Sequence, residues 1–453
     1  MQEVQDYTYV SYKVDTTGYN KDKIHSKTYT NTKGMLYTIL NNDSTCITFD
    51  DNETRVYRSI VLDDTSNIVC FSPMNGVPLD TFIEKYPQLT SDIYANEIME
   101  GTMINLFYEK RSQTWEISTR GAIGGNYWFY RTKYANNVTE NDVSKQTTFR
   151  QMFMEALRYN KYDELDTVQF LDLLPKNYCY SFVLQHPENH IVLVNEAPRL
   201  FLVSVYDLAD DNRCVFIPPT IYESWECFSN IPIEFPQHYS SDSYDTIRQK
   251  YASIQADYSS MGVMFTNITT GDRASMENPV YEEVKKLRGN NPNLQYQYFC
   301  LERSEQTQSF LNYFPIYKKI FGTFSRQYHD FITNVHQSYF SYYVKKEGIP
   351  IAKKYFIHAS KIHHNIYLPS IGIKKVDIET VKVEGYDNAS EITIEEPIAT
   401  PMKYNKIVIT RKVVKDYFDA LTPSEILYYL SYDKIKIEKA KHSTADDQVD
   451  VSA

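Results

Sequence analysis

The chain has 453 residues, of which 42% are hydrophobic and 23% charged, and its formal net charge at pH 7 is −11. The apolar content excludes wholesale disorder, and the length is sufficient for two or three domains. The acidic balance argues against a protein whose whole surface coats nucleic acid.

Targeting, membrane and metal signals are missing from the sequence. No run approaches the roughly 18 apolar residues that a spanning helix needs, and residues 1–10 do not resemble a signal peptide. The six cysteines form no CxxC pair, and no histidine lies at zinc-ligand spacing from them. We therefore expect a cytoplasmic protein with reduced thiols, no metal site and no membrane partner.

The first 300 residues are rich in short runs in which apolar and polar residues alternate, a pattern that predicts antiparallel strands. The predicted strands are 35–40, 46–49, 56–62, 68–71, 101–108, 114–119, 124–130, 180–184, 191–194, 200–206 and 262–267. Helices are predicted at 80–86, 145–158 and 280–288, the last ended by Gly289. The fold class that follows is α+β with a large antiparallel component.

The remaining residues predict a mainly helical region. Aromatic residues recur at helical spacing over 309–343, which predicts two or three amphipathic helices. A turn-rich, partly β stretch is predicted for 348–409, followed by helices at 412–421 and 424–430. Residues 442–453 are polar and predict disorder. We therefore expect three regions, 1–300, 301–440 and 441–453.

Five segments, in order, resemble the motifs of ATP-dependent RNA ligases of the phage tRNA-repair type, which belong to the covalent nucleotidyltransferase superfamily. They are 57–62 with 70–73; 98–104; 115–121; 180–192; and 262–265 with 278–282 and 287–290. The resemblance implies that 1–300 form an ATP-grasp-like adenylation domain built on antiparallel sheets. It also implies that the mainly helical C-terminal domain helps to recognise RNA, because 417–423 and 428–432 resemble the closing helices of those ligases.

The resemblance also implies that the reaction of the family is lost. In these ligases the lysine of a KxDG motif attacks the α-phosphorus of ATP, since an amine is a good nucleophile. The matching residue here is Ile98, in the string Ile98-Met99-Glu100-Gly101. An alkyl side chain has no lone pair, so no lysyl-adenylate can form at this position, and we expect no catalytic residue.

Other charged positions of the family are also replaced. Val183 stands at the second carboxylate, Met261 at the metal-associated glutamate, and Ser275 or Met276 at a phosphate-binding lysine. Losing such contacts removes about 5 to 8 kcal/mol, whereas a micromolar site totals about 8 kcal/mol. We therefore expect no cofactor and millimolar or absent ATP affinity. ATP and Mg²⁺ would be needed only by an active enzyme.

Three polar positions of the motifs survive. Arg58 and Arg120 match family residues that lie near phosphate, and Glu100 matches a residue that can contact ribose. They are the candidates for residual nucleotide or phosphate binding. In the alternative interpretation, the two arginines form structural ion pairs and Glu100 has a packing role.

Further strings that could carry chemistry have plainer interpretations. Residues 382–385 spell a second KxEG string, but it follows the other motifs instead of preceding them. His363 and His364, placed on a strand, would point to opposite faces, so with His358 they are interpreted as exposed histidines. His186 and His190 flank a predicted structural turn.

Three functions remain open. The first is an RNA ligase-like pseudoenzyme that binds RNA or acts as a scaffold, contacting RNA through the groove and the helical domain. The second is an active RNA ligase with a non-standard lysine. The third is a structural or assembly protein of a large DNA virus, since the general style of the sequence resembles such proteins. A viral protein would be located in the host cytoplasm or in the virion. Its protein partners are open. Residues 1–300 carry about 26 basic and 39 acidic side chains and 301–440 about 20 and 16, so the back half is compatible with a polyanion partner.

Overall fold

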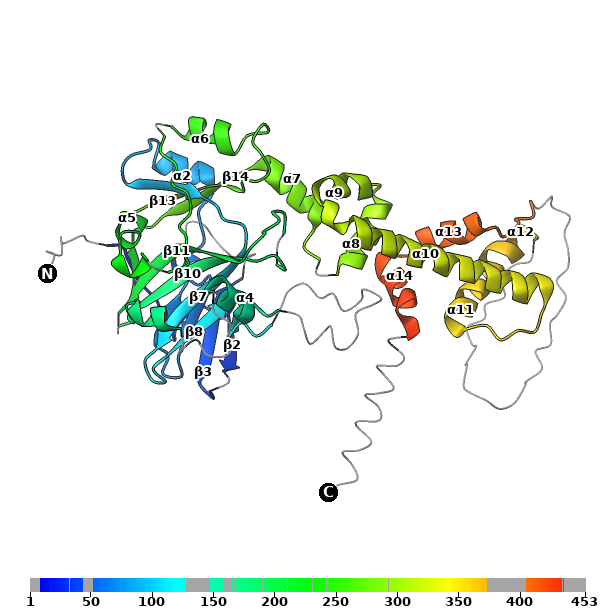
Figure 1. The fold of residues 1–453 in the computed structure, drawn as a ribbon, viewed down its shortest axis with the longest axis horizontal. Helices are drawn as coiled ribbons and strands as arrows, with labels where there is room; N and C mark the ends of the chain where they lie inside the picture. Colours follow the sequence, from blue (N-terminus) through cyan, green and yellow to red (C-terminus); the bar gives the residue numbers. More distant parts are fainter. Residues whose placement is uncertain are drawn as a thin grey trace, which may run out of the picture. The chain divides into compact units, whose positions relative to one another are not determined.

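The computed structural model describes residues 9–31, 33–43, 52–127, 147–158, 165, 168–189, 191–209, 211–229, 231–241, 243–291, 293–372, 405–433 and 435. These residues form two compact units, and the second unit begins at Asn293 (Figure 1). Both helices and antiparallel sheets are present, as the sequence predicted. Among the described helices, none is long and apolar enough to cross a bilayer.

A seven-stranded antiparallel sheet forms the centre of the first unit, in the order β1-β12-β11-β10-β7-β8-β9. Its strands are β1 Ser11–Lys13, β7 Thr102–Glu109, β8 Thr114–Thr119, β9 Ala122–Ile123, β10 Tyr178–Gln185, β11 Arg199–Leu208 and β12 Arg213–Ile217. Two smaller antiparallel sheets accompany it, in the orders β2-β3-β4-β5 and β14-β13-β6. Their strands are β2 Ile24–Thr30, β3 Leu36–Asn42, β4 Ile60–Leu62, β5 Ile68–Phe71, β6 Ile93–Glu97, β13 Gly262–Asn267 and β14 Arg273–Glu277.

Short helices connect the strands of the first unit. They are α1 Asn52–Arg55, α2 Leu79–Lys85, α4 Phe149–Ala156, η2 Gln169–Leu173, α5 Pro219–Tyr222, η3 Glu226–Phe228, α6 Tyr244–Tyr251 and α7 Pro279–Arg288. Helix α4 begins at a capping box, in which Thr148 and Gln151 exchange hydrogen bonds. Helix α7 begins at Asn278 and ends before Gly289, whose φ of 67° suits a residue without Cβ.

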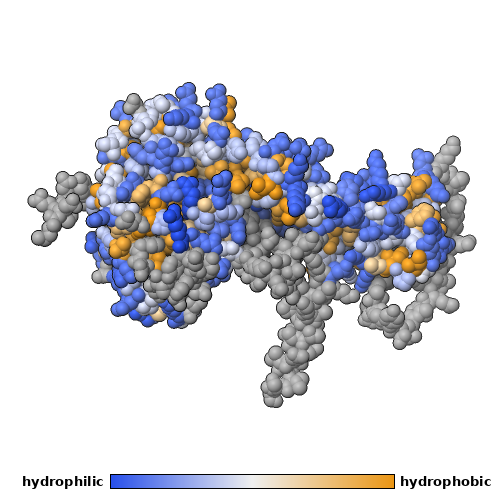
Figure 2. Space-filling model, viewed as in Figure 1, coloured by the Kyte–Doolittle hydropathy of each residue, from blue (hydrophilic) through white to orange (hydrophobic). Residues whose placement is uncertain are grey.

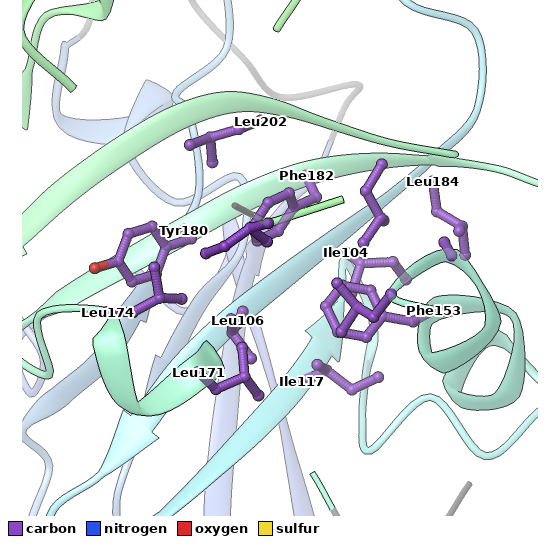
Figure 3. Close-up of a cluster of buried hydrophobic side chains, with 14 of the residues drawn as sticks. Ile104, Leu106, Ile117, Phe153, Leu171, Leu174, Tyr180, Phe182, Leu184 and Leu202 are labelled. Carbon is purple, nitrogen blue, oxygen red and sulfur yellow. The ribbon is translucent and has the colours of Figure 1, made fainter. Parts of the chain in front are cut away.

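Period-2 alternation gives the large sheet two buried faces. Ile104 and Leu106 of β7 pack with α4 and η2 on one face, whereas Phe107 packs toward the four-stranded sheet on the other. Figure 3 shows Phe153 of α4 beside Ile104, and Leu174 beside Tyr180 of β10. Each such side chain contributes about 1.5 to 3 kcal/mol on burial. The three-stranded sheet has its own core beneath α2 and α6.

The second unit is helical in its described residues. Its elements are α8 Leu294–Arg303, α9 Thr307–Tyr313, η4 Pro315–Tyr317, α10 Lys318–Tyr339, η5 Phe340–Lys345, α11 Lys353–Ile362, η6 His363–Tyr367, α12 Leu368–Ser370, α13 Arg411–Asp419 and α14 Pro423–Leu430. The long helix α10 buries an aromatic and aliphatic stripe at helical spacing. Phe331 of this stripe packs against Phe418 of α13. Hydrophilic residues cover much of the surface seen in Figure 2, with hydrophobic residues between them.

Several local predictions differ from the structure. Residues 191–193 form a bend and not a strand, because a buried carboxylate takes their backbone N–H groups. Residues 124 and 125 form a turn after β9, where both glycines have positive φ, and residues 126 and 127 are not in a strand. Residues 353–370 are helical, so His363 and His364 lie on a helical turn and not on a strand. Residues 46–49, 382–385, 442–453 and His190 lie outside the described residues.

Candidate functional site

A cavity of about 280 Å³ in the first unit is lined by both the seven-stranded and the three-stranded sheet. This volume lies near the lower end of the range for small-molecule pockets. Ile98, Val183 and Met261, which are far apart in the sequence, all line it. These are the positions to which the sequence resemblance assigns the nucleophile, a carboxylate and the metal-associated glutamate of the ligases. The fold therefore brings these three positions to one cavity.

Backbone pairing fixes the position of Ile98. This residue follows β6 directly, and β6 pairs with β13 so that Glu97 lies opposite Val263. The Ile98 N–H then donates to the Gly262 carbonyl oxygen at 3.1 Å. Gly262 has a φ of 125°, and a Cβ there would meet the Met276 carbonyl oxygen at 2.1 Å, so only glycine allows this close approach. Ile98 therefore lines the same cavity as Arg58.

Two arginines line this cavity, and the motifs had indicated only one of them. Arg58 lies in the turn before β4, and Arg273 is the first residue of β14. Within the described part of the chain, neither guanidinium has an ion-pair or hydrogen-bond partner. Burial, followed by the fields of Arg273 and Arg120, lowers the pKa of Arg58 to about 10. The alternative interpretation of Arg58 as a structural ion pair therefore finds no partner in the described residues.

Arg273 could have been found from strand alternation. Ala274 and Met276 are buried, so residues 273 and 275 share the opposite face of β14. Ser275 is one of the two positions assigned to the lost phosphate-binding lysine. A cation two residues upstream therefore presents its side chain on the same face of the strand, and cross-strand pairing puts it opposite Thr266.

Glu100 has a different environment. It is only 2% exposed, and its carboxylate accepts hydrogen bonds from the N–H groups of Ile191, Val192 and Leu193 at 2.9 to 3.2 Å. The Tyr281 hydroxyl donates to the same carboxylate at 2.7 Å. These bonds join the 191–193 bend and helix α7 to the end of β6. Its oxygens are thus engaged within the protein.

A second cavity, of about 380 Å³, shares Arg58 with the first. Arg120 lines this second cavity and is exposed. Hydroxyl and amide side chains make up much of the remaining lining: Ser59, Ser72, Thr102, Asn105, Thr119, Asn189 and Asn290. Arg58 therefore lines both cavities, whereas Arg120 lines only the second.

The histidines considered earlier lie elsewhere. His186 is buried, and its Nε2 lies 2.9 Å from a Glu155 carboxylate oxygen. His358 is fully buried in the helical unit, with its Nδ1 3.0 Å from the Tyr417 hydroxyl, so the prediction that it is exposed is wrong. His363 stacks on Tyr343 at 3.8 Å between ring centroids and is half-buried.

The lining of the first cavity has two carboxylates, those of Glu97 and Glu223, but neither is at the position that the resemblance gives to the metal-associated glutamate of the ligases. Mg²⁺ and Mn²⁺ favour carboxylate oxygens, and the position matching the metal-associated glutamate carries the Met261 thioether. Among the residues that the structure describes, no group of three His, Cys, Asp or Glu could hold a metal ion. The described residues that line the two cavities also include no lysine.

Comparison with known proteins supports the resemblance to RNA ligases. The RNA ligase of Rhodothermus phage RM378 is 28% identical over 134 residues, which are 30% of this chain and 26% of the phage protein. The match thus spans about a quarter of the length of that curated relative. No family model matches the chain. The similarity to RNA ligases that the motifs predicted is confirmed.

Solved structures of ligases also align with parts of the chain. A Naegleria gruberi RNA ligase mutant with ATP and Mn has 10% identity and a TM-score of 0.33, over 47% of this chain and 58% of that one. A putative ATP-dependent DNA ligase from Aquifex aeolicus has 12% identity and a TM-score of 0.35, over 68% and 70% of the two chains. Both TM-scores are below 0.5, which is too low for a conclusion about function.

Proposed function

We propose that this chain is an RNA ligase-like protein that binds RNA and has lost lysine adenylylation. The observation that carries the proposal is the lining of the first cavity, where Ile98, Val183 and Met261 stand together. Three aliphatic or thioether side chains cannot supply the nucleophile, the carboxylate or the metal ligand that the ligase reaction requires.

RNA binding is supported by the cations that remain. Arg58 and Arg120 line the two cavities, and in the described residues neither has a carboxylate partner. Cations without a protein counter-charge are the groups that contact phosphate in RNA-binding proteins. RNA is therefore the macromolecular partner that the chemistry of this surface favours.

The loss of adenylylation is tested with α-labelled ATP in the presence of Mg²⁺ or Mn²⁺. We expect no label on the denatured full chain, because no amine lines the cavity within the described residues. A variant with Ile98→Lys, Val183→Glu and Met261→Glu restores the three side chains together and serves as the matched comparison. We expect it to gain a label that is acid-labile and base-stable, as a phosphoramidate is.

An adduct on the unmodified chain would establish the competing function, an active ligase with a non-standard lysine. Mapping the labelled peptide would then identify that lysine. Nothing in the described lining of either cavity favours this function. The third function, an assembly protein without an RNA partner, is distinguished by the salt dependence of RNA binding.

A further inference from the structure

Within the described residues, the two arginines of the first cavity form no ion pair, although a carboxylate lies next to one of them in the sequence. Asp272 precedes Arg273 directly, but its oxygens lie 2.6 Å from Lys85 Nζ and 3.5 Å from the Arg55 guanidinium. The Tyr86 hydroxyl donates to it at 2.8 Å as well. This carboxylate is therefore already engaged by other groups, and it does not neutralise the cavity.

Two carboxylates, those of Glu97 and Glu223, also line the cavity. Burial raises the pKa of Glu97, and Arg199 is the charged side chain that acts against that shift. Burial also raises the pKa of Glu223, which accepts a hydrogen bond from the Tyr94 hydroxyl at 3.0 Å. For Glu223 the neighbouring cation is His238. Within the described residues, neither carboxylate forms an ion pair or a hydrogen bond with Arg58 or Arg273, although all four side chains belong to residues that line the cavity.

Arg58 and Arg273 line the same cavity, and the positive charge of Arg273 adds to the effect of burial in lowering the pKa of Arg58. Burial lowers the pKa of Arg273, and the neighbouring phenols of Tyr206, Tyr12 and Tyr222 act in the opposite direction. Phenol hydroxyls are dipoles and do not cancel a full charge. Two partly desolvated cations without an anion are unfavourable, and an anion that contacts both removes the repulsion.

We propose that Arg58 and Arg273 form a clamp that holds a phosphomonoester without covalent chemistry. The guanidinium group suits this ligand because its planar N–H donors match phosphate oxygens in pairs. The cavity of about 280 Å³ accommodates a terminal nucleotide and not a duplex. Arg273 supplies the phosphate contact from a position outside the family motifs. This inference rests on the proposed function and identifies the chemical class of ligand that the cavity would bind.

The phosphomonoester has two sources, the 5′ end of an RNA chain or a free nucleotide, and one experiment separates them. The full chain is titrated with a 5′-phosphorylated RNA 12-mer, the same 12-mer with a 5′-hydroxyl, AMP and inorganic phosphate. For an RNA end, we expect the 5′-phosphate to tighten binding by roughly 10- to 100-fold. For a free nucleotide, AMP binds and the two RNAs bind equally.

The variants for this test are Arg273→Gln and Arg273→Lys, with Arg248→Gln as the matched control. Arg248 is exposed on α6 and pairs with Asp245, outside the cavity. We expect Arg273→Gln to abolish the preference for phosphate, Arg273→Lys to retain much of it, and the control to match the unmodified chain. A 5′-phosphate effect below twofold, together with no binding of AMP or phosphate, would overturn the clamp.

Thermal unfolding separates the clamp from a structural role of Arg273. In phosphate-free buffer we expect Arg273→Gln to melt at or above the temperature of the unmodified chain, since one repelling cation is gone. Phosphate should raise the melting temperature of the unmodified chain and leave the variant unchanged. A lower melting temperature with an unaltered phosphate response would show a structural role and contradict the clamp.

The clamp and the proposed function fail in different ways. Binding of the 5′-hydroxyl RNA that does not depend on Arg273 leaves the RNA-binding function standing even when the clamp is overturned. Absence of binding to either RNA, with AMP or phosphate still held through Arg273, supports the clamp and overturns RNA as the partner.

Discussion

Glu100, which the sequence analysis named as a candidate for nucleotide binding, has a structural role in the fold. Its carboxylate accepts hydrogen bonds from three successive backbone N–H groups, at residues 191, 192 and 193, and from the Tyr281 hydroxyl. Hydrogen bonds to an ionised acceptor are about twice as strong as neutral ones. The 191–193 bend therefore depends on this one side chain for its backbone hydrogen bonds.

Replacing this carboxylate should destabilise the first unit. We expect Glu100→Ala to lower the free energy of unfolding by about 3 kcal/mol or more, because the bend loses its acceptor and buried N–H groups stay unsatisfied. Urea unfolding followed by tryptophan fluorescence measures this change, since all three tryptophans precede residue 293. Glu196→Ala is the matched control, an exposed glutamate of the same loop, with an expected change within about 0.5 kcal/mol. Equal stability of the two variants would contradict the structural role.

At the scale of residues, the motifs pointed to positions that line one cavity, but not to every cation that lines it. Ile98 could be identified because a motif string surrounds it, and the absence of an amine is visible in the letters. Arg273 belongs to no motif, and its importance depends on a strand pairing that sets it beside a distant turn. Whether Glu100 faces a cavity or a backbone bend depends equally on tertiary structure.

Helices α10, α11 and α13 pack around a buried histidine. His358 of α11 lies against the rings of Phe331 and Phe418, and its Nδ1 lies 3.0 Å from the Tyr417 hydroxyl. Burial, with a smaller effect of Lys361, lowers the pKa of His358 to about 4. The packing of these helices therefore requires the neutral imidazole.

This requirement makes the helical unit sensitive to acid. The pKa of His358 is lower in the folded chain than the unfolded value of 6.5. Between these two values the unfolded state binds more protons, so this contribution to stability is complete above pH 6.5 and is lost as the pH falls toward 4. From pH 7 to pH 5 we expect a loss of about 2 kcal/mol from this residue.

Urea unfolding followed by helical circular dichroism at both pH values measures the effect. His358→Gln should remove this part of the pH dependence, although the variant is less stable at pH 7. His329→Gln, which changes an exposed histidine of α10, should leave the pH dependence intact. The same pH dependence in His358→Gln and in the unmodified chain would show that His358 does not titrate on unfolding.

Elements with strong periodicity could be predicted, and those governed by tertiary hydrogen bonds could not. The spacing of aromatic residues predicted the region of α10, and alternation predicted β8 with its bounds, 114–119. The strand predicted at 191–194 is absent because Glu100 takes its N–H groups. Helix α11 was missed because Gly348 and Pro350 favour a turn, whereas the chain resumes a helix directly after it.

Charge is distributed unevenly over the molecule, and this has a consequence for RNA binding. The net charge of −11 repels a polyanion at long range, so any affinity for RNA must come from local groups of cations. Lys346 and Lys353 of the helical unit have no carboxylate partner among the described residues. Arg120 of the first unit also has no carboxylate partner among the described residues. Such cations release counterions when they meet phosphate.

The salt dependence of RNA binding therefore tests the function of the whole chain. We expect the affinity for a single-stranded RNA to fall with ionic strength, with a slope of log K against log salt near −0.7 for each phosphate contact. Arg120→Gln should reduce the magnitude of the slope by about 0.7. Arg213→Gln is the matched control, because its Nε already lies 2.6 Å from an Asp211 carboxylate oxygen. Binding without a slope, or no binding at low salt, would instead favour an assembly protein, since phosphate contacts by these cations cannot be independent of salt.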